Sequence, residues 1–85
     1  MNSAVIQGVV MDTPKSMLIN NKPAIEFVVS VPSLRKEEKP YLLRAKGMEI
    51  LGIDVDDNVI LEGRILINQE TKKPELMFKN AQVVK

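Results

Sequence analysis

Positive charges and a single tyrosine are the residues whose types and spacing could do chemistry in this sequence. Arg44 and Lys46 stand two positions apart, so a strand would project both from one face. Tyr41 lies just upstream, and strict alternation places it on the opposite face, so a bulge would be needed to bring all three together. Further cations precede them: Arg35, Lys36 and Lys39. Cations that neutralise phosphates and an aromatic ring that stacks on a base are the elements of single-strand binding.

Two other groups of cations are weaker candidates. Arg64 follows Glu62 closely, so a structural ion pair with that carboxylate is as good an explanation as a phosphate contact. Lys72 and Lys73 lie in a polar segment between two apolar runs. They are flanked by Glu70 and Glu75, which favours a solvated loop over a DNA contact.

The sequence offers little for catalysis or for a metal. It contains no cysteine and no histidine, which removes the usual thiolate nucleophile, the usual general base and the commonest metal ligand. Asp54, Asp56 and Asp57 form an acidic cluster, but it lacks the glycine and the closing glutamate of a calcium loop. We therefore predict a turn there, and we expect no enzyme activity, no cofactor and no metal site.

Length and composition bound the remaining possibilities. The chain has 85 residues, 45% of them hydrophobic and 27% charged, which is typical of one small globular domain spanning residues 1–85. No apolar run approaches the roughly 20 residues that span a bilayer, and Met1–Ala4 lacks the basic start of a secretory signal. We expect a cytoplasmic protein without membrane contact. The net charge of +1 gives no global field that would favour nucleic acid.

Alternating apolar residues predict five strands separated by polar turns. The residues from Gly47 to Ile53 are expected to form the only helix, with Met48, Ile50 and Leu51 available for packing. The expected strands cover residues 5–11, continued by 17–19, and then 24–31, 41–46, 59–68 and 76–84.

Five strands with one short helix between the third and fourth are the element order of an all-β OB-fold barrel. Gly63 sits where a barrel strand would bend. Phe27 and Phe78 fall in alternating apolar segments, which favours burial over base stacking. The other residues predicted to form the core are Ile6, Val10, Ile25, Val29, Val59 and Leu61.

Several segments together resemble bacterial single-stranded-DNA-binding proteins. Residues 20–31 are similar to the Asn-Gly-Lys-Pro…Phe-x-Val-x-Val stretch that opens the second strand of that family. Residues 57–65 are similar to its Gly-Asp-x-Val-x-Val-Glu-Gly-Arg-Leu strand, and Tyr41 falls where the family places an aromatic residue. The resemblance covers nearly the whole chain in order. It implies single-stranded DNA binding in replication, recombination or repair, across the elements that carry Tyr41, Arg44 and Lys46.

The sequence also departs from that family. Lys46-Gly47 stands where the family usually has an aromatic residue followed by glycine, and only three aromatic residues are present. This scarcity is similar to the primosomal replication protein N branch, a dimeric relative. An alternative function therefore stays open, in which the barrel is a protein–protein assembly module with little or no nucleic-acid binding. DNA and RNA are not distinguished.

A homo-oligomer, either a dimer or a tetramer, is expected on physical grounds as well. Small domains without disulfides or metals often gain stability by association. Ile60, Ile65 and Leu66 make both faces of one predicted strand apolar, which is more than a small core can bury.

Overall fold

Every regular element of the described residues is a β-strand. The computed structural model describes residues 3–33, 39–48 and 52–84. No helix in these ranges is long and apolar enough to cross a membrane. The strands are β1 (Ala4–Val10), β2 (Lys15–Ile19), β3 (Lys22–Val31), β4 (Tyr41–Met48), β5 (Asn58–Ile67) and β6 (Pro74–Val84).

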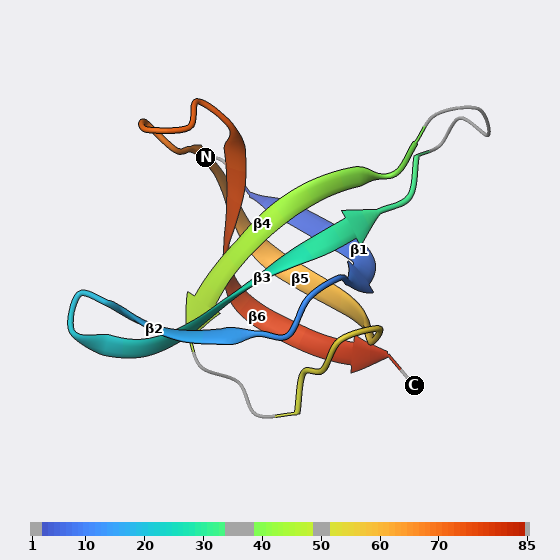
Figure 1. Cartoon of the computed structure of the whole chain (residues 1–85), viewed down its shortest axis with the longest axis horizontal. Coiled ribbons are helices and arrows are strands. Elements are labelled where there is room, and N and C mark those ends of the chain that lie inside the picture. Colours follow the sequence, from blue (N-terminus) through green and yellow to red (C-terminus); the bar gives the residue numbers. More distant parts are fainter. Residues whose placement is uncertain (1–2, 34–38, 49–51, 85) are drawn as a thin grey trace.

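Five of the strands close into a barrel (Figure 1). Their order around it is β1-β5-β6-β4-β3, and β3 returns to β1 through the pairs Val9 with Ser30 and Val10 with Val29. All the pairings are antiparallel except that of β4 with β6. The closed five-stranded OB-type barrel predicted from the sequence is confirmed.

The remaining strand, β2, continues the line of β1 along β3. β1 and β2 both pair with β3, and between them Asp12 replaces one ladder contact, because its Oδ1 accepts a hydrogen bond from the Val28 N–H at 2.8 Å. Pro14 also lacks an N–H for any ladder. The β2–β3 hairpin turns at Asn20 and Asn21, both at positive φ, and projects from the barrel in Figure 1.

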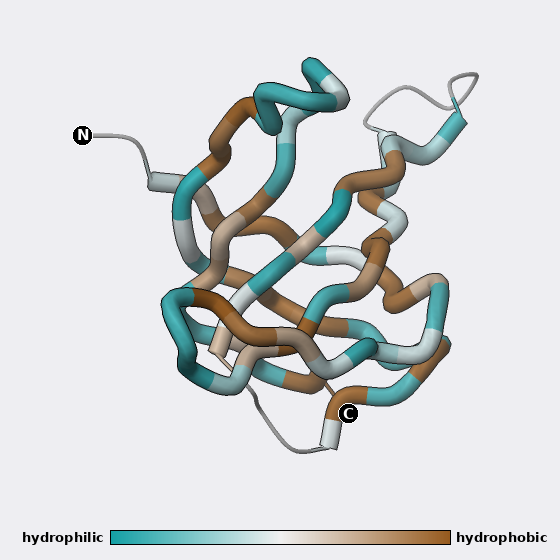
Figure 2. The backbone as a smooth tube through the Cα atoms, turned by 60° about the vertical axis from the view of Figure 1, so that its left-hand side comes forward, coloured by the Kyte–Doolittle hydropathy of each residue, from teal (hydrophilic) through white to brown (hydrophobic). Residues whose placement is uncertain are grey.

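The barrel interior holds the predicted core. Phe27 and Phe78 are almost fully buried with ring centroids 5.8 Å apart. Of the residues predicted to be buried, only Ile6 is partly exposed, and it still packs against the core. Leu43, Ala45, Leu76 and Ile53 complete the cluster. The alternation of apolar and polar residues along the strands is visible in Figure 2.

The predicted helix is wrong. Gly47 and Met48 continue β4, and none of the described residues is helical. Ile53 belongs to the core without being in a helix, and residues 49–51 lie outside the described ranges. The physical reason is at Gly47, which pairs with both Ile25 and Phe78, and where a Cβ would overlap the Phe78 ring. The glycine is there for close approach to the aromatic ring and does not mark a helix start.

Gly63 has the predicted role in bending its strand. The register between β5 and β6 shifts between Glu62 and Gly63, so the strand is irregular at this point. A Cβ at Gly63 would collide with the backbone of Met77. Glycine at this position therefore allows β5 and β6 to approach this closely at the irregularity.

Candidate nucleic-acid interface

A groove opens where β4 begins. It has a volume of about 550 Å³ and lies between the first residues of β4 and the β5–β6 loop. We call it the Tyr41 groove. The residues that line it are Val28, Tyr41, Leu42, Arg44, Thr71, Lys73, Pro74 and Glu75.

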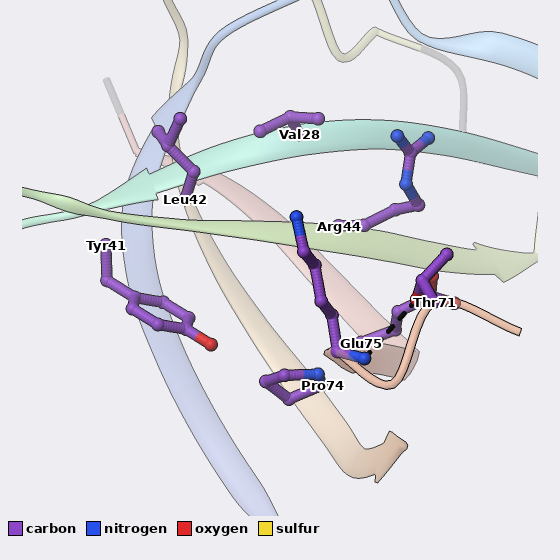
Figure 3. Close-up of a pocket in the computed structure, with 8 residues that line it drawn as sticks. Val28, Tyr41, Leu42, Arg44, Thr71, Pro74 and Glu75 are labelled. Carbon is purple, nitrogen blue, oxygen red and sulfur yellow. Dashed lines mark hydrogen bonds between the residues drawn. The ribbon is translucent and has the colours of Figure 1, made fainter. Parts of the chain in front are cut away.

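Tyr41 and Arg44 both line the groove, but from opposite sides of β4, as strict alternation predicts. The register between β3 and β4 is regular from Tyr41 to Met48, so no bulge is present. β4 pairs with β6 only from Arg44 onward. At Tyr41 no strand of the described residues pairs with that edge, and Tyr41 stays 52% exposed. In Figure 3 the ring lies on the Pro74 side of β4, while Leu42 and the Arg44 guanidinium lie on the other side.

The β5–β6 loop that forms the opposite wall is held by its own hydrogen bonds. Asn68 Oδ1 accepts from the backbone N–H groups of Glu70 at 2.9 Å and Thr71 at 3.2 Å. The backbone of Asn68 also accepts from the Lys72 N–H at 2.7 Å and donates to the Lys73 carbonyl at 2.9 Å. The loop therefore presents Lys72 and Lys73 from an ordered turn.

Lys72 and Lys73 are both exposed. Within the described residues neither forms an ion pair. Lys73 lines the Tyr41 groove, whereas Lys72 does not line it. The carboxylates that flank this loop in sequence, Glu70 and Glu75, therefore leave both lysines unpaired.

Arg44 and Lys46 both project from the outer face of β4, as their spacing predicts, and both are paired. Arg44 Nη1 forms an ion pair with Glu26 Oε1 of β3. Lys46 Nζ lies 3.1 Å from Glu75 Oε1 of β6. Glu75 also accepts a hydrogen bond from Asn68 Nδ2 at 3.0 Å, so it links the β4 face to the loop.

The remaining predicted residues are more scattered. Arg64 is exposed on β5 opposite Met77, which itself pairs with Lys46, so Arg64 lies on the same outer surface two strands away. It is not paired with Glu62, whose carboxylate contacts Lys79 and Asn80. Lys39 is exposed just before β4. Arg35 and Lys36 lie outside the described residues.

Sequence analysis missed the two carboxylates that hold the β4 cations. Glu26 lies at an outward position of β3, between the buried Ile25 and Phe27, and this alternation was readable from the sequence. Its partner was not, because the pairing depends on the register with β4. Asn68 was detectable as a turn residue in a polar loop.

The acidic cluster forms a turn, as predicted. The Asp54 N–H donates to Asp57 Oδ2 at 2.9 Å, and Asp56 has a positive φ of 72°. The backbones of Asp56 and Asp57 bond to Val10 at the end of β1. No group of His, Cys, Asp or Glu suited to a metal ion occurs among the described side chains.

Comparison with protein families and with curated proteins gives no relative at the level of sequence. No family model matches the chain, and no curated protein matches it either.

Solved structures, in contrast, match over nearly the whole length. The SSB domain of a protein from Synechococcus sp. is 29% identical with a TM-score of 0.81, covering 96% of this chain and 94% of its own. A small single-stranded DNA-binding protein from Streptomyces coelicolor is 16% identical with a TM-score of 0.82, covering 99% and 96%.

The dimeric N-terminal domain of the PriB protein from Thermoanaerobacter tencongensis is 18% identical with a TM-score of 0.79, covering 99% of this chain and 97% of its own. These neighbours are the two kinds of protein that the sequence resembles. The resemblance is therefore confirmed in the fold: over nearly its whole length the chain matches the OB barrel of SSB- and PriB-type single-stranded-DNA-binding proteins.

Proposed function

We propose that this chain binds single-stranded DNA across β4, over the outer face that carries Arg44 and Lys46 and into the Tyr41 groove at the start of the strand, where a base is held. The chain acts as a binding protein in replication, recombination or repair, within the cytoplasm, and carries out no reaction. The proposal is supported by its structural neighbours, which include an SSB domain and a small single-stranded DNA-binding protein of the same barrel type.

The observation that carries the proposal is that an exposed tyrosine and a lysine with no ion pair among the described residues line the same groove. Tyr41 is 52% exposed, and Lys73 lines the same groove from the β5–β6 loop. A base stacked on Tyr41 would have its phosphate near that lysine. Stacking on one aromatic residue contributes about 1–3 kcal/mol, and the phosphate contact adds affinity that depends on salt.

The other predicted cations extend this surface in both directions. Arg44 and Lys46 continue along β4, and Arg64 lies beyond them on β5. Lys39, Lys72, Arg35 and Lys36 stand near the start of β4 in the sequence or in the facing loop. We propose all of these as phosphate contacts, with Lys73 the principal one.

The test is a titration of fluorescently labelled oligo(dT) followed by anisotropy over a series of salt concentrations. Binding at low salt that weakens on Tyr41→Ala, and is kept by Tyr41→Phe, supports the proposal. Absence of binding by the parent chain at low salt would contradict it. Oligo(rU) in the same assay distinguishes a preference for RNA from one for DNA.

A second function, an assembly module, is favoured by a specific feature of the surface. Two of the predicted cations are already neutralised by Glu26 and Glu75. Exposed apolar side chains also lie outside the core: Val5, Leu18, Leu42 and Ile67 are each more than half exposed. If oligo(dT) binding is absent, this function replaces the first.

We also propose a homo-oligomer, either a dimer or a tetramer. Leu66 is 49% exposed on β5, whereas Ile65 packs against the core, so part of the predicted apolar excess remains at the surface. The PriB neighbour is dimeric. Sedimentation at micromolar concentration should give a mass at least twice the 9.5 kDa of one chain. A monomer alone would contradict the proposal.

A further inference from the structure

The carboxylates of Glu26 and Glu75 form ion pairs with Arg44 and Lys46, the same cations to which phosphates are proposed to bind. Both lie on strands that flank β4, one on β3 and the other on β6. Their side chains are only 22% and 15% exposed, against 46% for Arg44. A carboxylate oxygen and a phosphate oxygen accept from the same N–H donors, so the two anions compete for one guanidinium or one ammonium group.

This competition changes the salt dependence of binding. A phosphate that reaches a free cation releases condensed counterions, which gives single strands a slope of about −0.7 in log affinity against log salt per contact. A phosphate that reaches Arg44 first has to displace Glu26. Where Glu26 keeps Arg44, the phosphate does not make this contact, and the counterion release that belongs to it is lost.

We propose that Glu26 and Glu75 set the affinity and the salt response of DNA binding by holding Arg44 and Lys46 in ion pairs that a phosphate must displace. The proposal rests on the proposed function, because it concerns the same surface. It makes the two carboxylates affinity-determining residues although neither attracts DNA.

Glu26 gives the cleaner test of the two. Its carboxylate forms an ion pair with Arg44, and it has no hydrogen bond or ion pair with any other side chain among the described residues. Glu75 also accepts a hydrogen bond from Asn68 and so helps to hold the β5–β6 loop. Glutamine keeps the shape and an acceptor oxygen at either position while it removes the charge.

The control has to remove one negative charge without releasing a cation of β4. Asp56 is exposed in the turn before β5, and its side chain has no ion pair among the described residues. Asp56→Asn raises the net charge by the same unit, and asparagine tolerates the positive φ of this position. Any difference between Glu26→Gln and Asp56→Asn therefore reports the local ion pair rather than the overall charge.

The experiment is a set of oligo(dT) titrations of the parent, Glu26→Gln, Glu75→Gln and Asp56→Asn between 50 and 200 mM salt. The slope for Glu26→Gln should be more negative by about 0.7. Over this fourfold range of salt, the fold-loss of affinity of Glu26→Gln should therefore be about 2.6 times the fold-loss of the parent. Asp56→Asn should keep the parent slope. The double variant Arg44→Gln with Glu26→Gln should return to the parent slope, since the released cation is gone.

The outcomes separate this inference from the proposed function. If the parent binds but Glu26→Gln and Glu75→Gln both behave like Asp56→Asn, the carboxylates do not control binding and the inference is overturned. If the parent does not bind at low salt but either glutamine variant does, the inference is supported. If no variant binds, both the inference and the proposed function fail. Circular dichroism melts check that each variant is folded.

Discussion

At Tyr41, where β4 begins, the strand faces Lys73 across a groove, and that lysine has no ion pair within the described residues. Three residues further along, Arg44 is held by Glu26, and Lys46 by Glu75. Both regions have positively charged side chains on or beside β4. They differ in whether a neighbouring strand supplies a carboxylate. The availability of a cation to DNA therefore depends on its cross-strand neighbours as well as on its own type.

The two regions also differ in how they are held. The middle of β4 has β3 on one side and β6 on the other, so its backbone is paired on both edges. The start of β4 is paired with β3 alone, and its other edge faces a loop. A groove can form only at the second place, because a neighbouring strand would fill the space beside Tyr41.

The largest effect is expected on the stability of the barrel core, which lies beneath both regions. Phe27 belongs to β3, and its ring packs against that of Phe78 of β6 in the core. Phe27→Ala should lower the free energy of unfolding by about 3–5 kcal/mol, because it leaves a cavity in a small barrel. Denaturant unfolding measures this loss. Leu18→Ala, at a side chain 67% exposed, is the control and should change stability by less than about 0.5 kcal/mol. Equal losses in the two variants would mean that Phe27 is not a core residue in solution.

The next effect concerns the groove at the start of β4. Tyr41→Ala should weaken oligo(dT) binding by about 1–3 kcal/mol, the contribution of one stacked base, with little change in the salt slope. Anisotropy titrations over a salt series measure both quantities. Met48→Ala, at an exposed apolar residue at the other end of β4, is the control and should bind like the parent. If both variants bind equally well, Tyr41 is not a stacking platform.

A smaller effect distinguishes the unpaired cation from the paired ones. Lys73→Gln removes a charge that no described carboxylate neutralises, so the magnitude of the salt slope should fall by about 0.7. The double variant Arg44→Gln with Glu26→Gln removes a cation and its partner together and leaves the net charge unchanged. Its slope should stay close to that of the parent. Equal salt slopes for Lys73→Gln and the parent would mean that Lys73 makes no phosphate contact, so that the unpaired cation would contribute no more to DNA binding than the paired ones.

The smallest effect is on stability. The ion pair of Arg44 with Glu26 is partly exposed, and such pairs contribute about 0–1 kcal/mol to folding. A double-mutant cycle with Arg44→Gln and Glu26→Gln, measured by denaturant unfolding, should give a coupling energy in that range. A coupling of several kcal/mol would show that the pair holds the barrel together, and its two residues would then be unsuitable for testing DNA binding.

The sequence by itself determined the barrel and most of its interior. Period-two alternation placed Ile25, Phe27 and Val29 on one face of a strand, and all three are buried. Local patterns of this kind depend on neighbours along the chain, so they can be read without a structure. The same holds for the outward positions of Arg44 and Lys46, and for the turn at residues 54–57, although Asn58, which was expected in the turn, begins β5.

Tertiary structure alone decided what those outward residues contact. The helix expected from Gly47 failed because the role of this glycine is set by Phe78, a residue 31 positions away in the chain. The groove at Tyr41 depends on where the pairing of β4 with β6 begins. The pairing of Arg44 with Glu26 depends on the β3–β4 register, and that of Lys46 with Glu75 on the β4–β6 register. Each of these contacts joins segments whose alignment is fixed by closing the barrel, and no local pattern in the sequence encodes that alignment.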